Sequence, residues 1–140
     1  MVYFIDSNIF LRTLIADNKK QYHDCFRLLK NVKENRIEAV TGSIILAEIA
    51  WTLGSYYKFP KEKIIKAIKA VINLRGLKIL DNYQHLLAIN LYEKYAVKYI
   101  DALIASYQEL QDKTYCLVSY DKDFDKLTIV KKEPGEIKVQ

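Results

Sequence analysis

The sequence predicts an α/β domain in which helices cover both faces of a parallel sheet. Short apolar runs, rich in β-branched and aromatic residues, alternate along the chain with segments of helical periodicity. At 140 residues, of which 51% are hydrophobic and 28% charged, the chain can bury a substantial core as a single domain. With only four glycines and two prolines there is little room for linkers, so we expect one domain over residues 1–140.

Four or five short strands account for the apolar runs. The first, Val2–Ile5, stops at Asp6-Ser7-Asn8, and the others are expected at 37–40, 77–80, 115–118 and 128–130. Ligands of open α/β sheets bind beyond the carboxyl ends of the strands. Asp6 after the first strand and Asp121 after the fourth therefore stand where a site is expected.

The segments between the strands show helical patterns. Helices are expected at 9–16, 20–34, 44–56, 61–73, 83–95 and 101–111. Residues 131–140 are polar, contain Pro134-Gly135, and are expected to form a C-terminal tail.

Charge and cysteine usage point to a cytoplasmic protein with an anionic partner. The net charge of +5, despite 17 acidic residues, favours an anionic partner such as nucleic acid or an anionic membrane. Cys25 and Cys116 form no CxxC pair and are expected to be buried free thiols of a reducing compartment, with one disulfide as the alternative. The apolar stretch 39–57 is broken by Gly42 and carries Glu48, so we expect a core helix and no membrane span.

Three acidic residues could carry chemistry or serve the fold. Asp6 precedes a predicted helix and Asp101 begins one, and an N-cap is the alternative for both. Glu48 lies within a helix, and its neighbours one turn away are largely apolar. Its carboxylate needs either a metal or a Lys or Arg partner on such a face.

The segment from Ser119 to Asp125 places Asp121, Asp123 and Asp125 at alternate positions after a strand. An EF-hand loop starts similarly but needs Gly and Glu where this chain has Lys126 and Lys132, so that interpretation fails. An acidic turn is the remaining alternative.

Taken together, Asp6, Glu48, Asp101 and Asp121 suit a hard divalent cation. Mg²⁺ and Mn²⁺ prefer oxygen ligands, and carboxylates that repel one another converge most easily around a cation. Such an ion can activate water and stabilise the charge of phosphodiester cleavage.

Four sequence blocks resemble the signature blocks of PIN domains, in the family's order and over nearly the whole chain. The blocks are Phe4-Ile5-Asp6-Ser7-Asn8, Leu46-Ala47-Glu48-Ile49, Tyr99 to Ala105, and Val118 to Asp125. The chain is similar in size to stand-alone PIN proteins that act as VapC-type toxins. The resemblance implies a three-layer α/β/α fold with a central parallel sheet of four to five strands, and Mg²⁺- or Mn²⁺-dependent endoribonuclease activity.

The resemblance also implies roles for individual residues and partners. It carries the family's acidic positions onto Asp6, Glu48, Asp101 and Asp121, as metal ligands and catalytic residues. Asn8 and Ser119 match supporting polar positions. Asp123 and Asp125 are candidate additional metal ligands, but they match positions that vary in the family. A VapC-type toxin would cleave RNA, pair with an antitoxin and form a homodimer. Arg12 is a candidate contact to RNA phosphate, with a solvated surface charge as the alternative.

Three other functions remain open. His23 and His85 could act as general acid and base in metal-free RNA cleavage, although neither lies in a motif. A haloacid-dehalogenase-like phosphatase would use Asp6 as nucleophile, but it requires Asp at the position of Asn8. A catalytically silent module that binds RNA or protein is the alternative outside the enzymes.

Overall fold

The computed structural model describes residues 1–139, which form a five-stranded, all-parallel sheet with helices on both sides. The strands are β1 (Val2–Ile5), β2 (Glu38–Thr41), β3 (Leu77–Ile79), β4 (Tyr115–Val118) and β5 (Lys131–Lys132), in the order β3-β2-β1-β4-β5. This arrangement confirms the predicted fold class. The chain moves outward from β1 through β2 to β3, and later occupies the other side with β4 and β5. The switch point therefore lies between β1 and β4, where a ligand site is expected.

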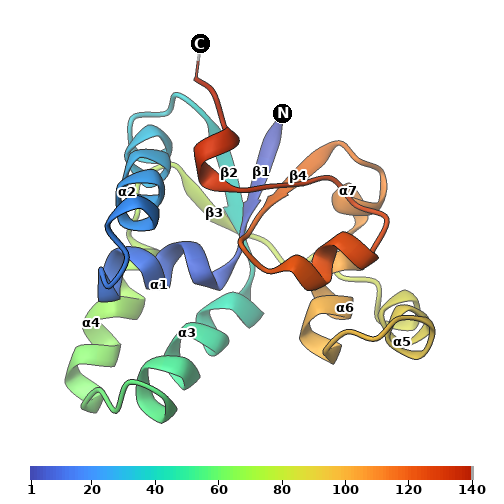
Figure 1. Ribbon diagram of the computed structural model, residues 1–140, viewed down its shortest axis with the longest axis horizontal. Helices are drawn as coiled ribbons and strands as arrows, with labels where there is room; N and C mark the ends of the chain where they lie inside the picture. The colour runs from blue at the N-terminus through green and yellow to red at the C-terminus, as the bar shows by residue number, and fades with distance from the viewer. Residues whose placement is uncertain (140) are drawn as a thin grey trace.

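In the described residues 1–139, seven α-helices cover the sheet. They are α1 (Ser7–Ile15), α2 (Lys19–Lys33), α3 (Ser43–Ser55), α4 (Lys61–Ile72), α5 (His85–Lys94), α6 (Tyr99–Ala105) and α7 (Gln108–Gln111). Figure 1 shows α1 to α4 on one side of the sheet and α5 to α7 on the other. The core is filled by aliphatic and aromatic residues of the central strands and the inner helix faces, including Phe4, Ile5 and Leu117.

The single helix expected at 101–111 is wrong, because the chain forms α6 and α7 with a break between them. The backbone of Tyr107 is non-helical there, with φ −54° and ψ 128°, and its buried ring packs edge-on against Phe4 at 5.2 Å between centroids. The hydroxyl of Ser106 donates to the carbonyl of Leu103 at 2.6 Å and ends α6. The break thus delivers an aromatic side chain to the core.

The predictions for the C-terminal region also need correction. The last strand is Lys131–Lys132, not 128–130, and residues from 131 onward are not a detached polar tail. Pro134 is buried, and Ile137 joins the core through a short 3₁₀ turn, η2 (Pro134–Glu136), which packs against α2. Apolar residues spaced this widely give no periodic signal, so the sequence did not reveal the packing.

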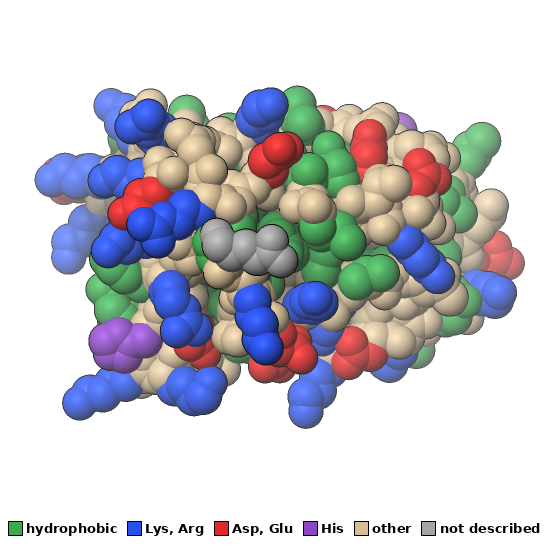
Figure 2. Space-filling view, turned by 90° about the horizontal axis from the view of Figure 1, so that it is seen from above, with side chains coloured by type: hydrophobic (Ala, Val, Ile, Leu, Met, Phe, Trp, Pro, Cys, Tyr) green, Lys and Arg blue, Asp and Glu red, His purple; other side chains and the backbone are tan. Residues whose placement is uncertain are grey.

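Both cysteines are buried free thiols, as predicted. Within residues 1–139, no helix combines the length and the apolar character that crossing a bilayer requires. Lys and Arg side chains are scattered over the face seen in Figure 2, with Asp and Glu among them. The excess positive charge is therefore not gathered into one stripe on this face.

Candidate metal centre

The predicted acidic residues are delivered by four separate elements. Asp6 directly follows β1, and Asp121 follows β4, the strand paired with β1. Asp101 lies in the first turn of α6, and Glu48 in the middle of α3. The carboxyl ends of the two central strands thus hold the first pair of carboxylates, and two helices bring the others.

Asp6 is 4% exposed and uses both of its oxygens. Oδ1 accepts a hydrogen bond from the backbone N–H of Ser7 at 2.8 Å, so Asp6 is the N-cap of α1. Oδ2 accepts from the hydroxyl of Ser119 at 2.6 Å and from Nδ2 of Asn8 at 3.2 Å. Capping and a place in the site are therefore compatible for this residue.

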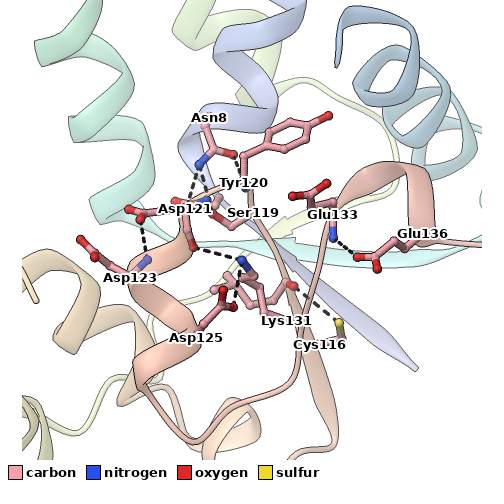
Figure 3. Close-up of polar contacts among 12 residues, drawn as sticks. Asn8, Cys116, Ser119, Tyr120, Asp121, Asp123, Asp125, Lys131, Glu133 and Glu136 are labelled. Carbon is pink, nitrogen blue, oxygen red and sulfur yellow. Dashed lines mark hydrogen bonds and ion pairs between the residues drawn. The ribbon is translucent and has the colours of Figure 1, made fainter. Parts of the chain in front are cut away.

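Asn8 and Ser119 connect the two strand ends. Asn8 donates to the Ser119 hydroxyl at 3.1 Å and accepts from the backbone N–H of Tyr120 at 3.3 Å. The Ser119 hydroxyl also accepts from the N–H of Asp121 at 3.0 Å (Figure 3). These bonds fix Asp6 relative to Asp121.

Three carboxylates gather most closely. Asp101, Asp121 and Asp123 each place an oxygen within 4.8 Å of the others'. Oδ1 of Asp121 accepts from the N–H of Asp123 at 2.9 Å and caps the 3₁₀ turn η1 (Lys122–Lys126). Asp101 is 3% exposed, and among residues 1–139 its buried Oδ2 has no hydrogen-bond partner. The N-cap expectation for Asp101 is wrong, because α6 begins two residues earlier at Tyr99.

Burial and neighbouring charges raise two pKa values in this cluster. Desolvation, followed by the charges of Glu48 and Asp121, raises the pKa of Asp6 from 3.8 to about 6, although the Ser119 hydrogen bond opposes the rise. Desolvation and the charge of Asp121 raise the pKa of Asp101 from 3.8 to about 7. Without a cation, therefore, Asp6 and Asp101 resist full ionisation near neutral pH.

Glu48 is less enclosed than the sequence suggested. It is half-buried, and its neighbour Trp51, expected on an apolar core face, is 69% exposed. The hydroxyl of Ser7 donates to Oε1 of Glu48. Among residues 1–139 no Lys or Arg forms an ion pair with Glu48, so the structure does not support the ion-pair alternative.

Two other predicted residues lie in ion pairs. Asp125 is exposed and pairs with Lys131 at 3.0 Å, outside the group of three carboxylates. Arg12 is near the end of α1 and pairs with Asp17 at 3.6 Å.

The two histidines are both exposed, His23 on α2 and His85 on α5. These helices flank opposite sides of the sheet in Figure 1. That placement offers no support for a general acid–base pair.

Sequence reasoning missed the contact of the Ser7 hydroxyl with Glu48 and those of the Lys126 ammonium beside the carboxylates. Lys126 donates to Asp123 at 3.2 Å and to the carbonyl of Ala96 at 3.1 Å. Both follow motif residues closely in the chain, but neither has a pattern that predicts its partner.

The residues present fit a divalent cation. The donors are carboxylate oxygens, which Mg²⁺ and Mn²⁺ prefer, and three of them converge from two segments. The unpartnered buried oxygen of Asp101 needs a cation, a proton or a donor to offset its desolvation. Asp6 and Glu48 lie outside this group of three, but the charge of Asp6 acts on Asp101 and that of Glu48 acts on Asp6.

Comparison with known proteins identifies the fold. No curated protein sequence gave a match. A crystal structure of VapBC2 from Rickettsia felis bound to a DNA fragment from their promoter contains a chain with 22% identity and a TM-score of 0.65, and the alignment covers 95% of this chain and 98% of that one. The sequence model of the PIN domain matches residues 3–130, which is most of the chain. The chain therefore belongs to the PIN domain family.

Proposed function

We propose that the chain is a divalent-metal-dependent endoribonuclease and the toxin of a toxin–antitoxin pair. The convergence of Asp101, Asp121 and Asp123 beside the buried Asp6 carries this proposal. Membership of the PIN family and the likeness to a chain of the VapBC2 complex support it.

Asp101, Asp121 and Asp123 lie close enough to share Mg²⁺ or Mn²⁺, and Asp6 and Glu48 are proposed to complete the site. When bound, the ion supplies Lewis-acid stabilisation of a phosphodiester and lowers the pKa of water. Ser7 holds the Glu48 carboxylate, while Ser119 and Asn8 hold that of Asp6. The residues of the chain thus preorganise a set of negative charges that only a cation fully offsets.

Arg12 is proposed to contact RNA phosphate. Its pairing with Asp17 at 3.6 Å is long for a charge-assisted hydrogen bond, and Asp17 is largely exposed, so the pair costs little to break.

Phosphatase chemistry with Asp6 as nucleophile is less well supported. Asn8 occupies the position of the second aspartate in such enzymes, and it orients Asp6 and Ser119 instead. A catalytically silent binding module would not account for the clustering of Asp101, Asp121 and Asp123.

The decisive experiment is incubation with structured RNAs in Mg²⁺ or Mn²⁺ and, in parallel, in EDTA. Cleavage that needs metal and leaves 5′-phosphate and 3′-hydroxyl ends is expected. Asp121→Asn should abolish it. Glu62→Gln, which alters an exposed carboxylate on α4, should not. Metal-independent cleavage, or Mn²⁺ binding with no cleavage of any RNA, would reject the ribonuclease.

An antitoxin segment is proposed to bind a groove between α1, α2 and α4. The groove has a volume of about 500 Å³ and is lined mainly by apolar side chains such as Phe10, Phe26 and Leu74, with Lys30 and Lys33 also lining it. The partner would silence the enzyme by placing a basic side chain among the carboxylates.

A homodimer is proposed through α3 and α4. Trp51 and Tyr56 are 69% and 74% exposed there, and Ile65 and Ile72 are 44% and 48% exposed. Large exposed apolar side chains of this kind mark interfaces when they form a patch.

A further inference from the structure

The C-terminal segment 131–139 lies against the main chain that carries the site. β5 pairs with β4, and the N–H of Ser119 donates to the carbonyl of Lys132 at 3.1 Å. Ser119 in turn holds Asp6 through its hydroxyl. The match to the PIN domain ends at residue 130, so this support comes from a part of the chain outside the matched region.

Lys131 reaches from β5 to the turn that presents two of the carboxylates. Its Nζ donates to the main-chain carbonyl of Asp121 at 3.2 Å and pairs with Oδ1 of Asp125 at 3.0 Å (Figure 3). The Lys131 side chain is only 10% exposed. A charged amine with so little access to water needs partners that offset its desolvation, and these two contacts provide them.

The segment beyond β5 is anchored, so Lys131 has a fixed base. Glu133 accepts from the turn η2, and Glu136 returns a bond to the N–H of Glu133 at 2.7 Å. Ile137 is buried in the core beside α2. An ammonium group on an anchored strand can hold a neighbouring loop, whereas one on a mobile tail could not.

The turn η1 requires such a restraint, because its carboxylates and that of Asp101 repel each other. Asp121 and Asp123 face Asp101 within 4.8 Å, and this repulsion favours opening of the turn. Lys126 restrains the Asp123 end through Ala96. Lys131 restrains the Asp121 end and, through Asp125, the far side of the same turn.

We propose that Lys131 is a positioning residue of the metal centre. It holds the Asp121–Asp125 turn so that Asp121 and Asp123 face Asp101, and thereby sets the affinity for a divalent cation. Asp125 acts through Lys131 and is not itself a ligand. The inference rests on the proposed function only in treating the carboxylate cluster as the metal site.

The test is calorimetric titration of the full chain with Mn²⁺ at pH 8, after thermal melts have shown each variant folded. Lys131→Met should weaken Mn²⁺ binding by about 10- to 100-fold, the usual cost of losing a group that orients metal ligands. Lys131→Arg should recover most of the affinity, because a guanidinium can make both contacts. Lys132→Met, an exposed neighbour on the same strand, is the matched control and should bind like the wild type.

Asp125→Asn supplies a second test that does not disturb a buried side chain. It should weaken Mn²⁺ binding less than Lys131→Met does, and the double variant should be no weaker than Lys131→Met alone. Additive losses would make Asp125 a ligand in its own right and overturn its assigned role.

The outcomes separate this inference from the ribonuclease proposal. Wild-type affinity in a folded Lys131→Met variant overturns the positioning role and leaves the nuclease untouched. Weakened Mn²⁺ binding in that variant, with no RNA cleavage by the wild type, supports the positioning role and rejects the nuclease. If Lys131→Met does not fold, the Mn²⁺ affinity of Asp125→Asn is compared with that of the wild type. An unchanged affinity in Asp125→Asn then overturns the positioning role. A wild-type chain that binds no Mn²⁺ rejects both.

Discussion

The hydroxyl of Ser119 lies 2.6 Å from Oδ2 of Asp6, a hydrogen bond between residues 113 positions apart in the chain. It joins the ends of β1 and β4 at the switch point of the sheet. The bond opposes the desolvation that raises the pKa of Asp6, so it keeps more of the buried carboxylate ionised and available to a cation.

Ser119→Ala should therefore move metal binding to higher pH. Without the hydroxyl the pKa of Asp6 should rise above about 6, and a cation must then displace a proton over a wider pH range. Mn²⁺ affinity should fall more at pH 6 than at pH 8, as measured by calorimetry. Ser55→Ala, at the exposed end of α3, is the control. An unchanged pH dependence in Ser119→Ala would contradict this role of the hydroxyl.

The metal-free chain should lose stability as pH rises, through Asp6 and Asp101. Both pKa values are raised on folding, from 3.8 to about 6 and about 7. Their stabilising effect is complete below about pH 4 and is lost as pH rises through 6 and 7, at up to about 1.4 kcal/mol per pKa unit. Mn²⁺ should reverse the trend, because it binds the ionised carboxylates.

Urea unfolding in EDTA at pH 5 and pH 8 measures this effect. The free-energy difference between wild type and the double variant Asp6→Asn, Asp101→Asn isolates the two carboxyls from all other titrating groups. If the wild type gains stability relative to the variant between pH 5 and pH 8, the sign is wrong and the cluster is not electrostatically strained.

Asp101→Asn should abolish RNA cleavage while stabilising the metal-free fold. The change removes a buried charge whose Oδ2 has no partner among the described residues, and it removes repulsion from Asp121. At pH 8 in EDTA we expect a gain of about 2 kcal/mol, which is the pKa shift converted at ~1.4 kcal/mol per unit, less the cost of a buried amide. Thermal melts and an RNA assay measure both effects, with Glu62→Gln as control. A folded variant with full activity would remove Asp101 from the site.

Much of the fold, and the placement of the acidic residues at strand ends, could be predicted because both depend on local sequence patterns. The strand that stops at Asp6-Ser7-Asn8 and the alternation of strands and helices led directly to the parallel sheet. The carboxyl ends of strands in a parallel sheet share one edge, so the sequence alone predicts that Asp6 and Asp121 lie near each other.

The remainder depends on tertiary contacts that leave no periodic trace. A segment of good helical propensity is interrupted at Tyr107, because the ring of Tyr107 packs against Phe4 in the core. The sequence predicts that Lys131 is part of a polar tail, but in the structure it lies on β5, which pairs with β4. Glu48 looked enclosed because Trp51 is apolar, yet the structure leaves Trp51 exposed. In each case a single long-range contact, or its absence, overrides the local pattern.

Gly42→Ala should destabilise the start of α3, the helix that carries Glu48. A Cβ at Gly42 would lie 1.8 Å from the hydroxyl oxygen of Tyr83, whose ring packs edge-on against Tyr107 and cannot simply move away. We expect a loss of about 1 to 3 kcal/mol in unfolding free energy, typical of overpacking. Adding Tyr83→Phe removes the clashing atom and should restore part of the loss in urea unfolding. Equal losses in the single and double variants would place the strain elsewhere.

The proposed homodimer gives a prediction about mass in solution. α3 and α4 leave Trp51, Tyr56, Ile65 and Ile72 exposed, although Val71 and Ala67 on α4 are buried. Burying such side chains stabilises a contact by about 25 cal/mol per Å² of apolar area, so replacing any one of them should weaken the dimer. Light scattering at micromolar concentration should give twice the chain mass of 16.4 kDa.

Trp51→Glu should shift the population toward monomer, because it places a charge in an apolar contact. Leu86→Glu, on α5, is the matched control, since Leu86 is 84% exposed and lies on the other side of the sheet. A wild-type monomer would end the dimer proposal and leave the metal centre unaffected, whereas dissociation by Leu86→Glu alone would move the interface to α5.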